Sequence, residues 1–273
     1  MDLTRMYLDE SNNKRNYHSK YFNQNVSVNF KDNRIVSYFL YKDWKLLHND
    51  DNPYKSNEIV RAPERIPPCK FATVERAFNK KDEDYWLQFG IPTDVLTKFG
   101  VNAISKLIYH KDHSDTIITN EYMYQMNINN KELIKIYSPY DKEMKWLSYG
   151  RTKNLCLSNY ANPNHKTCCI CSGMKDALSL YCQMNKYIDV FFCNSETALL
   201  TSEQDLWLFN NYTYIYICYD NDETGIMQAE NLSKFYGYRN IVIPKIEGVK
   251  DIAEFYQYDK NKSISFFRKK III

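Results

Sequence analysis

Glycine is scarce in this sequence, and long apolar runs are missing. Only 7 of the 273 residues are glycine, whereas 24 are tyrosine. This bias is typical of an AT-rich genome, and it makes single tyrosines and lysines weak indicators of function. No stretch of about 18 apolar residues is present, and residues 1–20 lack the apolar core of a signal peptide. We therefore expect a cytoplasmic protein that does not use a membrane.

A large excess of either charge is also missing. The formal net charge is +3, with 25% charged and 44% hydrophobic residues, which is ordinary for a globular protein. The molecule as a whole is therefore not a polycation, and any contact with nucleic acid must come from local basic patches. The length suits one large domain or two modest ones with a buried core.

Disulfides are not expected, although the chain has 8 cysteines. The cysteines are spread along a chain with no export signal, which favours reduced thiols. His165, Cys168 and Cys171 have metal-like spacing, but residues 168–171 should form a buried strand, where side chains three apart face opposite ways. No second cysteine pair completes a zinc site, and residues 1–68 contain no cysteine.

The N-terminal region, residues 1–69, is polar and of uncertain fold. It contains a strand-like run at Val26–Phe30 and an aromatic run at Val36–Trp44. Four prolines in residues 51–69 break any regular element, so we interpret this stretch as a connector.

The next region combines helical and strand patterns. Residues 70–110 are expected to be helical, with Phe89–Pro92 ending one helix and starting another. Within residues 117–150, short apolar runs on either side of Asn129-Asn130 predict a β-hairpin. A further short strand is expected around Trp146.

From Lys166 onward, short apolar strands alternate with helical patterns. This alternation predicts right-handed βαβ crossovers and a parallel sheet. Ligands of such sheets bind outside the carboxyl ends of the strands. The expected strands are Cys168–Cys171, Val190–Cys193, Tyr214–Tyr219 and Ile241–Ile243.

Two aspartates follow the third of these strands. Asp220 and Asp222 are two residues apart, and in an extended chain this spacing places both side chains on one face. Two carboxylates there repel each other unless a cation lies between them, and Mg²⁺ binds through one or two carboxylates. Gly225 permits a tight turn into the next helix. The alternative is an acidic loop that only caps this helix.

Four motifs in this region carry a resemblance to a known family. The segment containing them, residues 166–258, resembles the TOPRIM domain of primases, topoisomerases and some nucleases, most of all the primases of phages and mobile elements. The resemblance implies Mg²⁺ or Mn²⁺ held by acidic residues and chemistry at a phosphodiester, and we assign the metal to Asp220 and Asp222 only. The motifs are CSGMKDAL at Cys171–Leu178, NSETA at Asn194–Ala198, YDNDETG at Tyr219–Gly225 and KDIAEF at Lys250–Phe255.

One position departs from the family pattern. Ser172 stands where the family usually has a glutamate that acts near the metal. A hydroxyl is a poor base at neutral pH and a weaker metal ligand than a carboxylate. We expect Glu196, in the loop after the neighbouring strand, to supply the missing charge; the alternative is a glutamate that faces solvent.

The stretch upstream of this domain is similar to the subdomain that precedes TOPRIM in primase cores. It begins with Lys135–Tyr140 and interleaves cations with aromatic rings, a surface that can pair phosphates and stack bases. A solvated β-hairpin is the alternative. The interleaved rings are Tyr137, Tyr140, Trp146 and Tyr149. The expected ligands of nucleic acid and nucleotide are Lys142, Lys145, Arg151, Lys175 and Lys250.

The sequence thus predicts an α/β fold, with a TOPRIM Rossmann-like parallel sheet joined to an α+β N-terminal subdomain. The expected boundaries are residues 1–69, 70–160 for the primase-like subdomain, 161–260 for the TOPRIM domain and 261–273 for the tail. We expect this basic and apolar tail to be a final strand or a segment that docks on a partner.

The preferred function is synthesis of short primers on single-stranded DNA from nucleoside triphosphates, with Mg²⁺ at Asp220 and Asp222, in the cytoplasm of a bacterial host. Two alternatives remain. One is a TOPRIM nuclease, and the other is a non-catalytic nucleic-acid-binding accessory protein, which Ser172 favours. No helicase-type phosphate loop is present, so a separate replicative helicase or zinc-binding protein is a possible partner.

Overall fold

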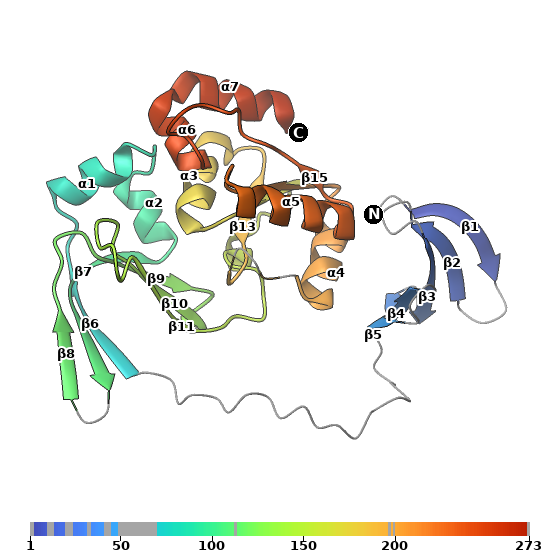
Figure 1. Cartoon of the computed structure of the whole chain (residues 1–273), viewed down its shortest axis with the longest axis horizontal. Helices are drawn as coiled ribbons and strands as arrows, with labels where there is room; N and C mark the ends of the chain where they lie inside the picture. Colours follow the sequence, from blue (N-terminus) through green and yellow to red (C-terminus); the bar gives the residue numbers. More distant parts are fainter. Residues whose placement is uncertain are drawn as a thin grey trace. The chain divides into compact units, whose positions relative to one another are not determined.

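The computed structural model describes residues 70–111, 114–195, 198 and 200–271, and also the backbone of five strands between Leu3 and His48. The connector at 51–69 and Glu196 lie outside the described residues. The chain divides into two compact units, residues 1–64 with 230–238 and residues 65–229 with 239–273. Figure 1 labels the elements of each unit.

The five N-terminal strands form one antiparallel sheet in which each strand pairs with the next along the chain. Such a meander needs only short turns between its strands. The expected strand Val26–Phe30 is confirmed, because it lies within β3. The strands are β1 (Leu3–Asp9), β2 (Lys14–Ser19), β3 (Gln24–Lys31), β4 (Arg34–Leu40) and β5 (Lys45–His48).

The second unit begins with an antiparallel sheet carrying two short helices. Its strands follow the order β11-β10-β9-β7-β6, with β8 paired to β7. The helices are α1 (Lys80–Leu87) and α2 (Thr93–Lys98). The strands are β6 (Lys70–Arg76), β7 (Val101–Lys111), β8 (Ser114–Ile118), β9 (Tyr124–Ile128), β10 (Leu133–Tyr137) and β11 (Trp146–Gly150).

The expectation that residues 70–110 are helical throughout was wrong at both ends. The two helices are present and meet at the predicted Phe89–Pro92 break, but β6 and β7 flank them and pair with each other. This pairing joins residues that are 27 (Arg76 and Ala103) to 40 (Lys70 and His110) positions apart, and no local pattern encodes it. Ile104 and Leu107 of β7 are buried in the core of this sheet, whereas Lys106 is exposed.

A buried carboxylate attaches α1 to the sheet. Asp82 closes a capping box with Asn79 at the start of the helix. Its side chain also accepts hydrogen bonds from both terminal nitrogens of Arg76 and from the Tyr124 hydroxyl, the latter at 2.9 Å. Because Asp82 is fully buried, these bonds provide the partners that a buried charge requires.

The predicted hairpin is confirmed. β9 and β10 pair in register from Ile128 with Leu133 to Tyr124 with Tyr137. The turn between them has left-handed backbone at Asn129 (φ 47°) and Asn130 (φ 57°), a conformation that asparagine tolerates well.

The rest of the chain is an α/β layer built on a parallel sheet; it belongs to the second unit except for residues 230–238, which group with the first. The strand order is β13-β12-β14-β15, and all pairs are parallel. A short 3₁₀-helix, Ser158–Tyr160, precedes it. The elements are β12 (Thr167–Cys171), α3 (Met174–Met184), β13 (Asp189–Phe192), α4 (Ser202–Asn211), β14 (Tyr214–Cys218), α5 (Glu223–Tyr236), β15 (Arg239–Asn240), α6 (Ile252–Tyr258) and α7 (Lys260–Lys270).

Two expectations for this layer need correction. The fourth strand is β15 at Arg239–Asn240, not Ile241–Ile243. The Ile241 amide still donates to the Ile217 carbonyl at 2.8 Å, but the ladder ends there, although both isoleucines are buried. The tail is a helix, α7, and not a final strand. Asp259 caps this helix by accepting a hydrogen bond from the Lys262 amide at 2.9 Å, and the basic residues of its last turn suit the negative end of the helix dipole.

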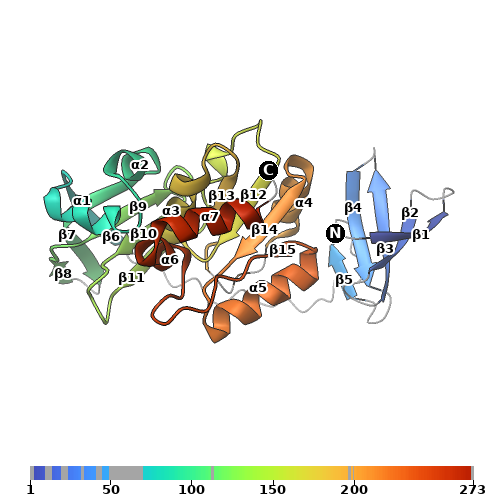
Figure 2. The ribbon, with the colours of Figure 1, turned by 90° about the horizontal axis from the view of Figure 1, so that it is seen from above.

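The predicted fold class is confirmed: a parallel α/β sheet is joined to an α+β subdomain within the second unit (Figure 2). Cys156 donates its amide hydrogen to the Phe192 carbonyl at 3.0 Å, and the Ser179 hydroxyl donates to the Phe89 carbonyl at 2.8 Å. These bonds connect the parallel layer to segments that precede it. The seven cysteines within the described part are free.

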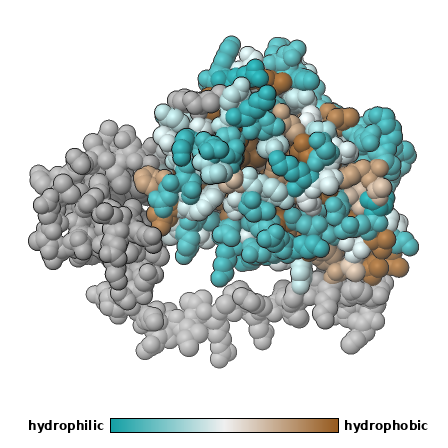
Figure 3. Space-filling view, turned by 180° about the vertical axis from the view of Figure 1, so that it is seen from behind, coloured by the Kyte–Doolittle hydropathy of each residue, from teal (hydrophilic) through white to brown (hydrophobic). Residues whose placement is uncertain are grey.

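The surface agrees with the composition. Figure 3 shows a face covered mainly by hydrophilic side chains, with apolar ones in small patches. Within the part of the chain that the structure describes, no helix is long and apolar enough to span a bilayer.

Candidate functional site

A cavity of about 550 Å³ opens at the carboxyl ends of β12, β13 and β14, against the face of β10 and β11. Its position follows from the topology, because the carboxyl ends of parallel strands meet at one edge of the sheet. The side formed by the β10–β11 hairpin is lined by Lys135, Tyr137, Lys145, Trp146 and Ser148. The side of the parallel sheet is lined by Ser172, Gly173, Met174, Lys175, Asp176, Asn194, Ser195, Asp220, Lys250, Asp251 and Glu254.

Three aspartates from separate parts of the chain reach this cavity. Asp220 follows β14, Asp176 lies in the first turn of α3, and Asp251 is the N-cap of α6. Asp176 is buried and accepts hydrogen bonds from the Ser172 hydroxyl and the Ala253 amide, each at 3.1 Å. Asp251 accepts from the Glu254 amide at 2.7 Å. Main-chain donors and a neutral hydroxyl thus hold the carboxylates in place.

The aspartates disfavour one another's ionised forms. Burial raises the pKa of Asp176 well above its ordinary value, and the charge of Asp251 raises it further. Burial also raises the pKa of Asp220, against the lowering effect of a hydrogen bond from Ser172. The Ser172 hydroxyl has one hydrogen, so it serves Asp176 or Asp220 at any moment. The cluster therefore favours an added positive charge.

Two lysines supply part of that charge. Lys175 pairs with Asp251 at 2.9 Å between Nζ and Oδ2, and Lys250 pairs with Asp220 at 3.5 Å. Burial alone would lower the pKa of Lys175, but the charges of Asp176 and Asp251 outweigh it, and the net shift is upward. The Lys250 side chain is 54% exposed, so its pair with Asp220 is the weaker of the two.

Lys135 on β10 is a different kind of cation. Burial lowers its pKa from the ordinary value, and its ammonium group lies over the Phe192 ring at 5.6 Å. Among the described side chains, no carboxylate forms an ion pair with it. A partly buried lysine that lines a cavity without an acidic partner is suited to binding an anion.

The comparisons with known proteins agree with this architecture. Residues 169–256 match the family model of the Toprim-like domain. We refer to this segment, residues 169–256, as the Toprim-like domain. A DNA primase domain from Pseudomonas aeruginosa has a similar fold, with 14% identity over 70% of this chain and 72% of that chain, at a TM-score of 0.53.

The primase fragment of the bacteriophage T7 primase-helicase protein is 16% identical over 86% of this chain and 90% of its own, at a TM-score of 0.48. No curated protein matches the chain. The predicted resemblance to TOPRIM primase-like proteins is confirmed for the Toprim-like domain and for the fold.

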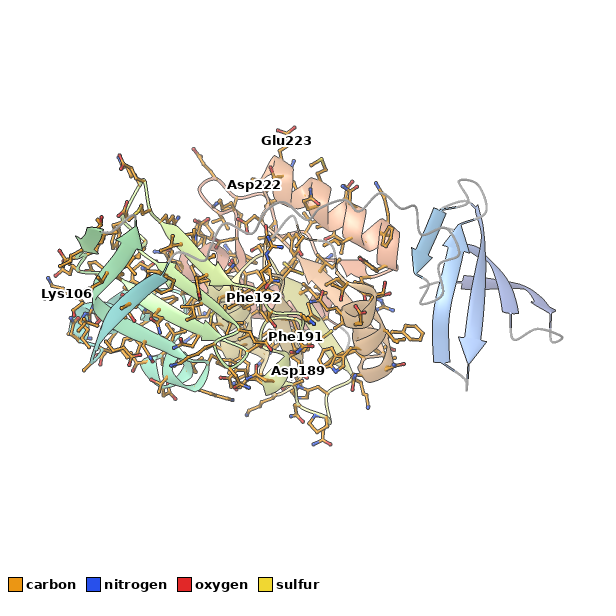
Figure 4. All side chains as sticks on the ribbon, turned by 90° about the horizontal axis from the view of Figure 1, so that it is seen from below. Lys106, Asp189, Phe191, Phe192, Asp222 and Glu223 are labelled. Atoms are coloured by element: carbon orange, nitrogen blue, oxygen red, sulfur yellow. The ribbon has the colours of Figure 1, made fainter. Side chains whose placement is uncertain are left out.

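The two aspartates of the Toprim-like domain's third motif have different surroundings. Asp220 lines the cavity. Asp222 is exposed and is not among the residues that line it; its Oδ1 accepts a hydrogen bond from the Gly225 amide at 2.8 Å and so caps α5. Figure 4 shows Asp222 and Glu223 at the start of that helix. The helix-capping alternative therefore describes Asp222 well, and the assignment of metal to it stays a prediction.

The structure separates the predicted cations into two groups. Lys145, Lys175 and Lys250 line the cavity, whereas Lys142 and Arg151 are exposed residues outside its lining. Glu196 lies outside the described residues, so its role as a substitute carboxylate stays a prediction. Its neighbour Ser195 does line the cavity.

Sequence reasoning missed several lining residues, and three of them carry charges that the site uses. Lys135, Asp176 and Asp251 each lie inside a motif quoted for the resemblance, so the signal was available. Asp176 and Asp251 are 75 positions apart in the sequence, and only the packing of α3 near α6 brings them to one cluster.

The donor set fits a hard divalent cation. Asp176, Asp220 and Asp251 offer oxygen ligands only, which suit Mg²⁺ or Mn²⁺. In the described part of the chain, no group of three or more acidic, cysteine or histidine side chains is arranged to hold a metal ion by itself. Mg²⁺ commonly uses one or two carboxylates, with water and substrate phosphate as its other ligands. Burial is the main cause of the raised pKa of Asp176 and of Asp220, and the charge of Asp251 adds to both shifts, so a bound cation would offset the cost of ionising these carboxyls.

Proposed function

We propose that the protein is a DNA primase-type nucleotidyltransferase that joins nucleotides on a single-stranded DNA template. The observation that carries this proposal is the cavity, in which carboxylates of the Toprim-like domain face Lys135 and Lys145 of the hairpin subdomain. The fold shared with a bacterial DNA primase domain supports it. One wall of the cavity suits a metal ion, and the other suits a polyphosphate.

The reaction needs these two walls at the same time. In primer synthesis the 3′-hydroxyl of one nucleotide attacks the α-phosphate of the next, and pyrophosphate leaves. Lys135 and Lys145 bind the triphosphate, while Asp220 and Asp251 are the residues that would hold Mg²⁺ or Mn²⁺. Bound there, the ion would supply stabilisation of negative charge on the attacking and leaving oxygens.

The two ion pairs of the cavity differ in strength, which gives their lysines different roles toward the substrate. Lys250 is half exposed and only weakly paired with Asp220, so its ammonium group would be available to the phosphates if Asp220 held a metal ion. Lys175 is more deeply placed, with 15% of its side chain exposed, and it stays with Asp251. The first lysine therefore contacts substrate, and the second positions a carboxylate.

Ser172 favours a second candidate, a binding protein without catalysis. The hydroxyl donates a hydrogen bond to Asp176 where the family's glutamate would add a carboxylate. Such a protein would bind single-stranded nucleic acid or nucleotide and transfer nothing. A nuclease would use the same carboxylates and would admit water in place of the 3′-hydroxyl. A separate replicative helicase or zinc-binding protein remains a proposed partner of the primase.

One assay separates these functions. The full chain is incubated with single-stranded DNA, labelled nucleoside triphosphates and Mg²⁺ or Mn²⁺, and the products are resolved by length. We expect short labelled oligomers from native protein and none from Asp220→Asn. Shortened DNA without oligomers would identify a nuclease. Binding of DNA without either product, across both metals and all nucleotides, would contradict the primase proposal and favour the accessory protein.

A further inference from the structure

Two aromatic side chains line the cavity: Tyr137 is buried, and Trp146 is exposed. It is a large aromatic side chain, 46% exposed, at the first position of β11. One face of its ring stacks on Tyr137, with ring centroids 4.2 Å apart and planes at 21°. Because Tyr137 covers that face, the exposed area lies on the opposite face and the ring edges. An uncovered aromatic face at a cavity lined by lysines is suited to stacking on a planar group.

The ring beneath Trp146 is held rigidly. Tyr137 is 3% exposed, and its hydroxyl shares a 2.7 Å hydrogen bond with that of Tyr85. Its ring also contacts Trp86, with centroids 6.0 Å apart, and Trp86 is fully buried. The platform is therefore ordered before any ligand arrives, which lowers the entropic cost of stacking.

The other aromatic side chains of the same hairpin lack this combination. Tyr140 is 63% exposed but does not line the cavity. Tyr149 packs edge-on against Phe71, with centroids 5.4 Å apart, and does not line it either. Stabilising the hairpin alone would not require Trp146 to keep nearly half of its surface exposed beside Lys135 and Lys145.

We propose that Trp146 stacks on the base of the nucleoside triphosphate whose phosphates Lys135 and Lys145 bind. This inference rests on the proposed function, because it assigns the base end of the same substrate. A cavity of about 550 Å³ lies within the usual range for small-molecule sites, about 300–1,000 Å³. Every base has a π-face, and stacking reads no base edge, so all four bases bind this platform.

The platform has a measurable value. Base–aromatic stacking contributes about 1–3 kcal/mol per base, which corresponds to roughly 5- to 150-fold in affinity. Removing the ring should therefore weaken the binding of a nucleoside triphosphate by this factor. The same change should leave the binding of inorganic tripolyphosphate untouched, because that ion has the same phosphates and no base.

The test is a calorimetric titration of the full chain with ATP, GTP and tripolyphosphate in Ca²⁺ buffer. We expect Trp146→Ala to weaken ATP and GTP by about 5- to 150-fold and to leave tripolyphosphate unchanged, while Trp146→Phe retains most of the affinity. Phe209→Ala is the control: it removes another exposed ring, on α4 and outside the cavity lining, and native affinity is expected for all three ligands.

Each other result has a defined meaning. Equal loss of ATP and tripolyphosphate, or no loss of either, overturns the platform. Loss of single-stranded DNA binding with ATP unchanged also overturns it, because the ring would then serve the template. Failure of native protein to bind tripolyphosphate contradicts the proposed phosphate site, and hence the proposed function. If Trp146→Ala does not fold, quenching of tryptophan fluorescence by ATP is compared between native protein and Trp146→Phe. The proposal predicts quenching in native protein that is lost in Trp146→Phe, and quenching that persists in this variant overturns it.

Discussion

Replacing Gly225 with alanine should displace the loop that carries Asp220. Gly225 lies in the first turn of α5, and a Cβ there would stand 2.2 Å from the carbonyl oxygen of Asp220. Real Cβ atoms essentially never approach another atom within 3.0 Å, so the two segments must separate by at least about 0.8 Å. Both groups belong to segments of main chain, and no side-chain rotation can relieve the overlap.

The size of the effect follows from that displacement. Overpacking of this kind costs about 1–3 kcal/mol of unfolding free energy, and the better helix propensity of alanine offsets about 1 kcal/mol of it. The net cost is then at most about 2 kcal/mol, and the melting temperature should fall by up to about 8 °C, at about 2–4 °C per kcal/mol. Activity should suffer more, because a misplacement of about 1 Å at a reacting centre can cost about 100-fold.

Gly173 provides a matched control for the same added methyl group. It is the N-cap of α3 at the end of a neighbouring strand, its backbone is extended (φ −160°), and a Cβ there meets no atom within 4 Å. Both alanine variants are melted and assayed for metal-dependent nucleotide incorporation. Gly173→Ala should keep the native melting temperature. Native activity in Gly225→Ala, or equal destabilisation of both variants, would refute the steric argument.

Three further predictions concern the charges of the site. Burial raises the pKa of Asp220, so the stability contributed by its protonated form is lost as pH rises through that pKa. Without metal, Asp220→Asn should therefore have a higher melting temperature than native protein at neutral pH, and the difference should disappear in acid. Equal melting temperatures of the two proteins at both pH values would contradict this. Lys145→Ala should weaken triphosphate binding and lower its salt slope by about one, whereas Arg151→Ala, outside the cavity lining, should change neither in the same salt titration. Ser172→Glu adds a carboxylate to a cluster of carboxylates that repel one another, so it should lower the melting temperature without metal and raise the affinity for Mg²⁺. If Glu196 supplies the missing charge, a double-mutant cycle with Glu196→Gln should show coupling in metal-dependent activity. Strictly additive effects of the two substitutions would exclude that role of Glu196.

Local patterns were sufficient for β12, β13 and β14 of the parallel layer and for the β9–β10 hairpin, but not for β6 and β7. Each strand from β12 to β14 is a short buried run of apolar residues, and each is followed by a helix with its own periodicity. β6 and β7 have no such signature, because their pairing depends on partners distant in the sequence. The charged residues between the apolar ones in residues 70–110 suggested a helix. In the structure one of them, Lys106, is an exposed residue of strand β7.

The candidate site shows the same division. Asp220 was predictable because it ends a strand at the edge where ligands of parallel sheets bind. The spacing of Asp222 from Asp220 allowed two interpretations, a metal ligand or a helix cap. The hydrogen bond that Asp222 accepts from the Gly225 amide is the one expected of a helix cap. The importance of Lys135 depends on its burial and on the lack of an acidic partner among the described side chains, and neither can be inferred from a lysine in a lysine-rich sequence.

A crystal structure of the protein with Mn²⁺ and a non-hydrolysable nucleoside triphosphate would test the central claim most directly, because the anomalous signal of manganese locates the ion. The account predicts a manganese peak in the cavity, bound by Asp220 or Asp251 and by phosphate oxygens, with Lys135 and Lys145 on the triphosphate. A peak elsewhere on the molecule, or a triphosphate bound outside this cavity, would contradict it.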